Sequence, residues 1–129
     1  MKPFLAAAVL FLSAPLAAST PGPLHTLAER SGFERTGRYD ETVALCAAFQ
    51  RRHPDAVRCL DFGTTPEGRP MKVLVVSRSG ALTPEAARER GIPVVLMQGG
   101  IHAGEVDGKD AGFLALRQGA FSNPSSYFN

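Results

Sequence analysis

The sequence predicts an α/β fold, because segments with helical periodicity alternate with segments typical of strands. Three observations carry this prediction. Residues 39–53 have an amphipathic helical pattern, and residues 56–77 read as strand, turn and strand. Residues 93–98 form an apolar run typical of a buried strand, and a glycine turn and a further helix follow it. At 129 residues the chain has room for one domain.

The N-terminus has the three parts of a secretory signal peptide, which we place at residues 1–18. Lys2 provides the positive charge, residues 4–12 are apolar but too short to span a bilayer, and small residues precede a cleavage point after Ala18. We therefore expect a secreted or periplasmic protein without a membrane span after cleavage. Residues 19–36 are expected to form a turn-rich linker and N-terminal segment.

An amphipathic helix is expected over residues 39–53. The side chains that share its inner face recur at helical spacing, at Thr42, Leu45, Cys46 and Phe49. Asp40 has the type of side chain that caps a helix N-terminus, and Pro54 ends the helix.

An antiparallel hairpin is expected next, with strands over residues 56–62 and 71–77. The sequence between them, GTTPEGRP, contains a proline that presets φ and a glycine that accepts positive φ. A short helix follows to about residue 90, with Thr83 as its N-cap and Pro84 as its first residue.

The two cysteines fall in adjacent predicted elements. Cys46 lies in the first long helix and Cys59 in the strand that follows, each on an apolar face. Because free cysteine is commonly buried, we expect two buried thiols. A disulfide is the alternative that an oxidising compartment would permit.

The candidate site lies in the stretch VVLMQGGIHAGEVDGKDAG, residues 94–112. An apolar run ends at Gly99-Gly100, and His102 and Glu105 follow at H-x-x-E spacing. Helix is expected from Gly104 to about residue 117, so that both side chains would lie on one helix face. Imidazole and carboxylate both bind Zn²⁺, and the pair is therefore a candidate for two zinc ligands.

The same predicted helix carries glycines on the face of Glu105. Gly108 and Gly112 fall there, and we expect that face to press closely against a sheet. Asp110 is expected to face solvent, and the alternative is that it is a partner for a nearby donor. A phosphate-binding loop is excluded, because Lys109 is followed by Asp rather than by Ser or Thr.

Composition limits the kinds of partner. The chain is 44% hydrophobic and 20% charged with a net charge of +2, which predicts no strong attraction to nucleic acid or to an anionic membrane. Residues 121–129, FSNPSSYFN, have no clear period and are expected to form an irregular, unpacked tail.

The stretches GTTPEGRPMKVLVVS and VVLMQGGIHAGEVDGKDAG resemble the zinc carboxypeptidase family, the metallocarboxypeptidases of the carboxypeptidase A type. The resemblance implies that residues 37–120 are the N-terminal part of an α/β/α sandwich with a mixed sheet. It implies Zn²⁺ as the cofactor, with His102 and Glu105 as two ligands. The implied activity is proteolysis, the removal of C-terminal residues from a peptide substrate.

The family pattern also needs residues that this sequence does not contain. A third zinc ligand, a His, and a catalytic Glu would both follow Asn129, so we expect an N-terminal part that is inactive alone. Gly104 stands where carboxypeptidase A-like members carry an Arg that helps to hold substrate. Two alternatives stay open: a zinc-dependent deacylase or amide hydrolase of the related type, and a secreted binding module without catalysis.

Overall fold

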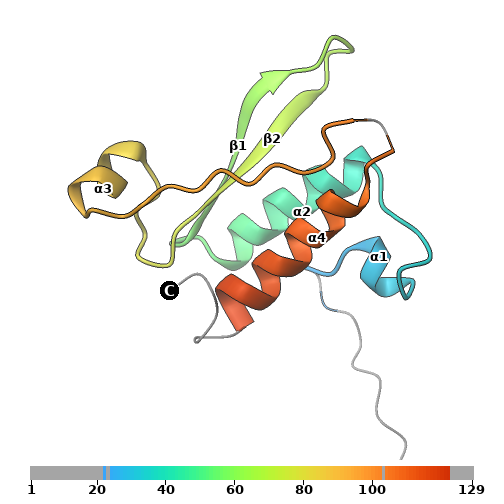
Figure 1. Ribbon diagram of the computed structural model, residues 1–129, viewed down its shortest axis with the longest axis horizontal. Helices are drawn as coiled ribbons and strands as arrows, with labels where there is room; N and C mark the ends of the chain where they lie inside the picture. Colours follow the sequence, from blue (N-terminus) through green and yellow to red (C-terminus); the bar gives the residue numbers. More distant parts are fainter. Residues whose placement is uncertain (1–21, 23, 103, 123–129) are drawn as a thin grey trace, which may run out of the picture.

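The computed structural model describes residues 22, 24–102 and 104–122, and shows helices together with one antiparallel β-hairpin (Figure 1). The α/β class predicted from the sequence is confirmed. The elements in chain order are α1 (Leu27–Arg30), α2 (Tyr39–Arg52), β1 (Val57–Thr64), β2 (Pro70–Val76), α3 (Pro84–Glu89), α4 (Asp107–Ala115) and the π-helix η1 (Leu116–Ser122). Within the described residues, the hairpin is the part of the expected mixed sheet that is formed. The predicted signal peptide lies outside these residues.

Helix α2 forms where the sequence predicts it and packs directly on the hairpin. Its N-cap is Arg38, so the prediction that Asp40 is the cap was wrong. Asp40 instead lies in the first turn, where a carboxylate interacts favourably with the positive end of the helix dipole. The helix ends with His53 as its C-cap, directly before Pro54, because proline cannot continue the backbone hydrogen bonds.

Strands β1 and β2 pair as the predicted antiparallel hairpin. Val57 lies opposite Val76 and Cys59 opposite Leu74, which places these four side chains on the face toward α2. The turn closes with the N–H of Thr65 donating to the carbonyl of Arg69 at 2.9 Å. Each strand therefore finds its partner locally, through one short turn.

The core lies between α2, the hairpin and α4. Phe49 and Val57 are completely buried, and the ring of Phe49 stacks on that of Phe113 with centroids 5.8 Å apart. Phe121 also packs here, 6.4 Å from Phe49 and 3.8 Å from His53 between ring centroids. The expected unpacked tail therefore does not begin at Phe121, because burying an aromatic side chain against this core stabilises the fold. Residues 123–129 lie outside the described part.

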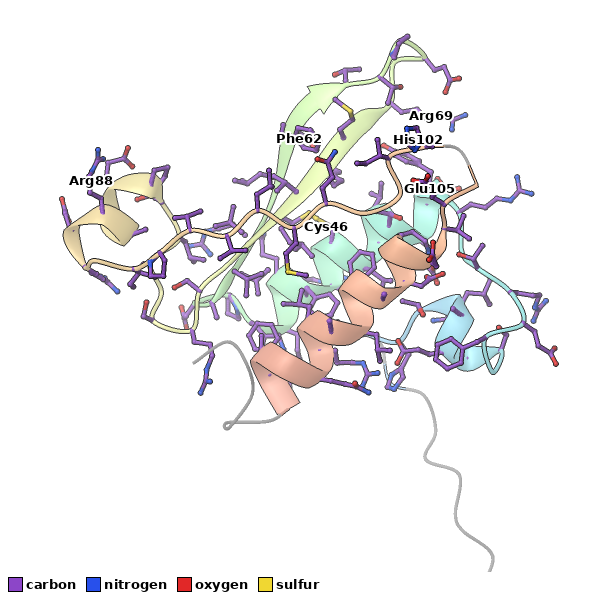
Figure 2. The ribbon with its side chains drawn as sticks, in the orientation of Figure 1. Cys46, Phe62, Arg69, Arg88, His102 and Glu105 are labelled. Atoms are coloured by element: carbon purple, nitrogen blue, oxygen red, sulfur yellow. A yellow bond between two sulfur atoms is a disulfide. The ribbon has the colours of Figure 1, made fainter. Side chains whose placement is uncertain are left out.

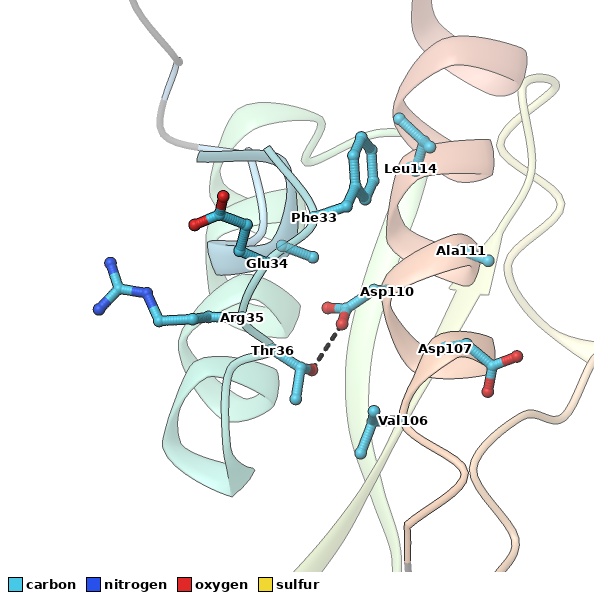
Figure 3. A pocket seen from close by; sticks show the side chains of 10 residues that line it. Phe33, Glu34, Arg35, Thr36, Val106, Asp107, Asp110, Ala111 and Leu114 are labelled. Carbon is cyan, nitrogen blue, oxygen red and sulfur yellow. Dashed lines mark hydrogen bonds between the residues drawn. The ribbon is translucent and has the colours of Figure 1, made fainter. Parts of the chain in front are cut away.

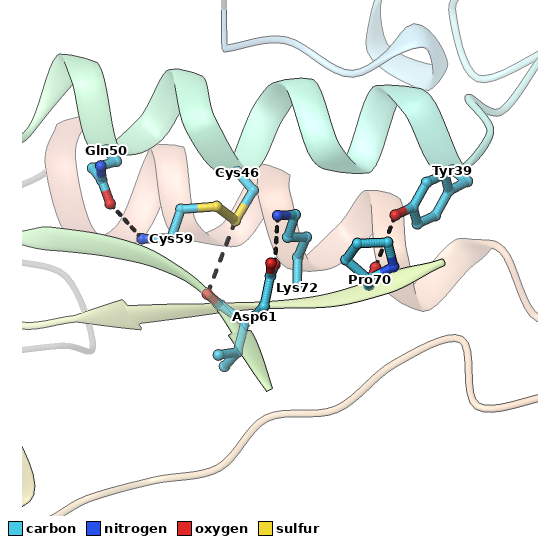
Figure 4. Close-up of a disulfide and its surroundings, with 8 residues drawn as sticks. Tyr39, Cys46, Gln50, Cys59, Asp61, Pro70 and Lys72 are labelled. Carbon is cyan, nitrogen blue, oxygen red and sulfur yellow. Dashed lines mark hydrogen bonds and ion pairs between the residues drawn. A yellow bond between two sulfur atoms is a disulfide. The ribbon is translucent and has the colours of Figure 1, made fainter. Parts of the chain in front are cut away.

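Cys46 and Cys59 form a disulfide that ties α2 to β1 (Figure 4). The expectation of two buried thiols was therefore wrong. Both cysteines do lie on apolar faces, but the two faces meet each other across the α2–hairpin interface. Their Cα atoms are 5.4 Å apart, within the range that a disulfide spans.

Helix α3 has the predicted cap. The hydroxyl of Thr83 accepts a hydrogen bond from the N–H of Ala86 at 3.2 Å, and Pro84 occupies the first turn. Gly91 follows with φ of +63°, a conformation that glycine adopts without a Cβ clash.

The strand predicted at residues 93–98 is not formed. The segment is extended, but among the described residues only β1 and β2 pair as strands. Val94, Val95 and Leu96 are 80%, 78% and 81% exposed. An apolar strand needs neighbours that bond its backbone and cover its faces, and the described chain provides neither here.

Candidate metal site

The candidate site lies on the loop between the extended segment and α4. Figure 2 shows the side chains of His102 and Glu105 close together above the start of α4. His102 Nδ1 is 2.8 Å from Glu105 Oε1, and the backbone N–H of His102 donates to Glu105 Oε2 at 3.3 Å. The structure thus brings together the two residues that the sequence singled out.

A turn, rather than a helix, places these two side chains. The N–H of Glu105 donates to the carbonyl of His102 at 3.2 Å, and the N–H of Val106 donates to that of Gly104 at 3.0 Å. Helix α4 begins at Asp107, so the prediction that helix starts at Gly104 was wrong. Gly104 has φ of +94°, which lies outside the right-handed helical region.

The glycines of this stretch allow the loop to touch the start of α4. A Cβ on Gly99 would lie 2.9 Å from the carbonyl carbon and oxygen of Gly108, closer than real Cβ contacts come. The expected close approach at Gly108 is therefore present, but it is to the Gly99-Gly100 turn and not to a sheet. A Cβ on Gly112 would meet no atom within 4 Å, so that glycine is not required by a close contact.

The other two histidines lie away from this pair. His25 Nδ1 is 3.1 Å from the carbonyl oxygen of Gly22, and His53 stacks on Phe121. In the described ranges, no group of three or more His, Cys, Asp or Glu side chains is placed to hold a metal ion. The site therefore offers one imidazole and one carboxylate.

One comparison with known proteins found a match, to a protein family. A model of the family described as zinc carboxypeptidase matches residues 42–123, which include most of α2, the hairpin and the His102–Glu105 loop. The chain belongs to the zinc carboxypeptidase family. Neither the curated proteins nor the solved structures gave a match. Across the described residues of this zinc carboxypeptidase family member, no helix combines the length and apolar character that crossing a membrane requires.

The donor pair fits the zinc ion that the family implies. Side chains of His102 and Glu105 are 76% and 54% exposed, so both donors are accessible. A tetrahedral ion with bonds of roughly 2.0–2.2 Å separates its ligand atoms by roughly 3.3–3.6 Å. The observed 2.8 Å between the two atoms therefore needs to widen by roughly 0.5–0.8 Å, which is within the reach of side-chain rotation.

Sequence reasoning missed a buried charge cluster next to this loop. Asp110 was expected to face solvent, but only 9% of it is exposed, and Lys109 and Thr36 both donate to its carboxylate. The signal was the run Gly-Lys-Asp at residues 108–110, which begins three residues after Glu105. Its partners Thr36 and Glu41 lie far away in the sequence. A hollow of about 460 Å³ lies beside this cluster, between residues 33–36 and α4, and neither His102 nor Glu105 lines it.

Proposed function

We propose that this chain provides two zinc ligands, His102 and Glu105, to a zinc-dependent carboxypeptidase that removes C-terminal residues from peptides. The observation that carries the proposal is the 2.8 Å approach of an imidazole nitrogen to a carboxylate oxygen on an exposed loop. Membership of the zinc carboxypeptidase family supports the same assignment.

Each residue has a distinct role in this proposal. His102 would bind the ion through a ring nitrogen and Glu105 through its carboxylate, both from the same turn. The ion, when bound, would polarise a substrate carbonyl and lower the pKa of a bound water. A Cβ at Gly104 would meet no atom within 4 Å, so the turn between the two donors is open at this position.

The 129-residue chain by itself is expected to bind zinc weakly and to hydrolyse no peptide. A catalytic zinc site keeps three protein ligands and one open position. The sequence contains no histidine after His102, and the described residues contain no three-donor cluster. With two ligands the ion would exchange readily, and its water would be poorly positioned.

Zinc affinity tests the assignment directly. Competition with a chromophoric chelator is measured for the parent chain, His102→Ala, Glu105→Ala and the control Glu67→Ala, which removes an exposed carboxylate from the hairpin turn. We expect each site variant to lose at least about tenfold in affinity, since even loss of an outer-sphere partner costs that much. Equal affinities in all four proteins would refute the proposal.

The hydrolytic part of the proposal needs a second measurement. Peptides with free and with amidated C-termini are incubated with zinc and the 129-residue chain, with and without a chelator; we expect no turnover. In a longer protein that contains this chain, we expect chelator-sensitive cleavage of the free-C-terminus peptide only, and Glu105→Ala should abolish it. Retained cleavage in that variant would argue against Glu105 as a ligand.

We further propose that the protein is exported. The proposal is supported by the signal-peptide pattern of residues 1–18 and by the Cys46–Cys59 disulfide, which is typical of oxidising compartments. N-terminal sequencing of the exported protein should begin near Ser19 or Thr20. Protein that stays in the cytoplasm with Met1 still present would contradict this.

A further inference from the structure

We infer that Lys109 is a positioning residue for the candidate metal site. Its ammonium is held between the carboxylates of Glu41 and Asp110 and fixes the first turn of α4, and thereby the loop that carries His102 and Glu105. The inference rests on the proposed function and adds a residue to it that does not itself touch the ion.

The ammonium of Lys109 is largely buried between the carboxylates of Glu41 and Asp110, and we call these three side chains the cage. Lys109 Nζ lies 3.1 Å from Glu41 Oε2 and 2.7 Å from Asp110 Oδ1. The three side chains are only 18%, 13% and 11% exposed. A charge with so little access to water needs its partners, and removal of one partner from such a buried group is strongly destabilising. The cage therefore favours one arrangement of α4 against α2.

Both carboxylates of the cage are held from the other side as well. The second oxygen of Glu41 accepts from the N–H of Leu27 at 2.5 Å and from Arg30 at 3.4 Å. The second oxygen of Asp110 accepts from the hydroxyl of Thr36 at 2.5 Å, as Figure 3 shows. The cage thus joins α4 to the N-terminal segment of residues 24–36 and to α2.

The cage acts on the metal loop because the two are adjacent. Lys109 follows Gly108, whose backbone touches Gly99 at the other end of the loop. The close approach of Gly99 and Gly108 leaves little room for the first turn of α4 to move toward the loop, and the cage opposes a shift away from it. Residues 99–102 and 104–106 are otherwise exposed, and the hydrogen bonds that hold them are short-range ones within the turn. The cage is therefore a buried anchor beside the loop that carries His102 and Glu105.

The zinc affinity of a Lys109 variant should change in one direction if the residue acts by its charge and in the other if it acts by position. A cation close to a divalent metal ion weakens metal binding, so loss of the Lys109 charge alone would strengthen it. Loss of a positioning contact would let the loop disorder and would weaken it. The direction of the change therefore separates positioning from a field effect.

The first test compares zinc affinities of folded variants by chelator competition. We expect Lys109→Met to bind zinc about tenfold more weakly than the parent chain, at the lower end of the range for outer-sphere partners. Lys109→Arg should recover most of the affinity because it keeps the charge. Lys72→Met is the matched control, since it removes a cross-strand pair with Asp61 in the hairpin, and it should leave zinc binding unchanged.

The second test does not need metal. Amide hydrogen exchange is measured for Glu105 and Val106, whose N–H groups close the loop, and for Thr65 in the hairpin turn as an internal control. In Lys109→Met we expect faster exchange at the two loop amides and unchanged exchange at Thr65. If Lys109→Met does not fold by circular dichroism, Glu41→Gln replaces it, with the same expected direction.

Two outcomes would overturn the inference. One is a folded Lys109→Met chain with equal or tighter zinc binding, and the other is unchanged exchange at both loop amides. A parent chain that binds no zinc would instead refute the proposed function. In that case the exchange measurement alone decides whether Lys109 orders the loop.

Discussion

Strand β2 and residues 93–98 have similar sequences but different structures. The first, PMKVLVV, pairs with β1 along its length, and six of its seven residues are partly buried. The second, PVVLMQ, is extended and exposed, with Leu96 81% and Met97 68% accessible. Both are rich in apolar and β-branched residues, so composition does not account for the difference.

The difference shows what an apolar run needs in order to become a strand. The partner of β2 lies one short turn away, so the loop-closure cost of pairing is small. Residues 93–98 have no such neighbour in sequence, and their partners would have to come from a distant segment. Propensity for β structure mainly reports how well a residue fits a pleated surface that is already partly covered.

The largest expected effect tests whether stability resides in the packed region. Phe49→Ala should lower the free energy of unfolding by about 3–5 kcal/mol, because it empties a completely buried position in the core. Phe62→Ala, at a 63% exposed position on the hairpin, should change it by less than about 0.5 kcal/mol. Urea denaturation measures both, and equal losses would show that the core is not where the structure places it.

The next effect concerns the disulfide between α2 and β1. Replacing both Cys46 and Cys59 with Ala should lower stability by about 3 kcal/mol, the value for a closed loop of this size. Thiol titration of the denatured, unreduced parent chain should find no free thiol. Two free thiols would restore the interpretation that the cysteines are only buried.

A smaller effect is the dependence of stability on pH that His53 causes at the C-terminal end of α2, where it stacks on Phe121. Burial, and then the positive charge of Arg52, lower the pKa of His53 below 6.5. Between that lowered pKa and 6.5 the unfolded chain binds more protons than the folded chain, so stability rises with pH. We expect the Tm to change little above pH 6.5, to fall as the pH drops toward the lowered pKa, and to stay low below it.

Matched arginine variants sharpen this test. Arg52→Gln should reduce the fall in Tm with decreasing pH, because it removes the second cause of the lowered pKa. Arg51→Gln changes the neighbouring charge and should leave the fall as it is. The same dependence on pH in all three proteins would assign the effect to groups other than His53.

The smallest expected effect lies in the exposed segment. Leu96→Ser should change the free energy of unfolding by less than about 0.5 kcal/mol, because the side chain gives up no buried contact. The measurement is urea denaturation of the monomer. A loss of more than about 2 kcal/mol, the size expected for a buried leucine, would show that residues 93–98 are packed in solution.

Local patterns were sufficient for several elements and for the candidate ligands. The sequence by itself determined α2, the hairpin and the Thr83 cap of α3, because each depends on periodicity, a turn or a capping side chain within a few residues. It also determined the His102–Glu105 pair, because a spacing of three residues keeps two side chains close in a turn as well as in a helix.

Only the tertiary structure decided which of these residues meet partners far along the chain. It joined Cys46 to Cys59, buried Asp110 against Thr36, and left residues 93–98 without a strand partner in the described chain. In each case the local sequence specifies only the chemical group that is available: a thiol, a carboxylate or an apolar run. The outcome depends on which surface another element brings to it, and local sequence does not contain that information.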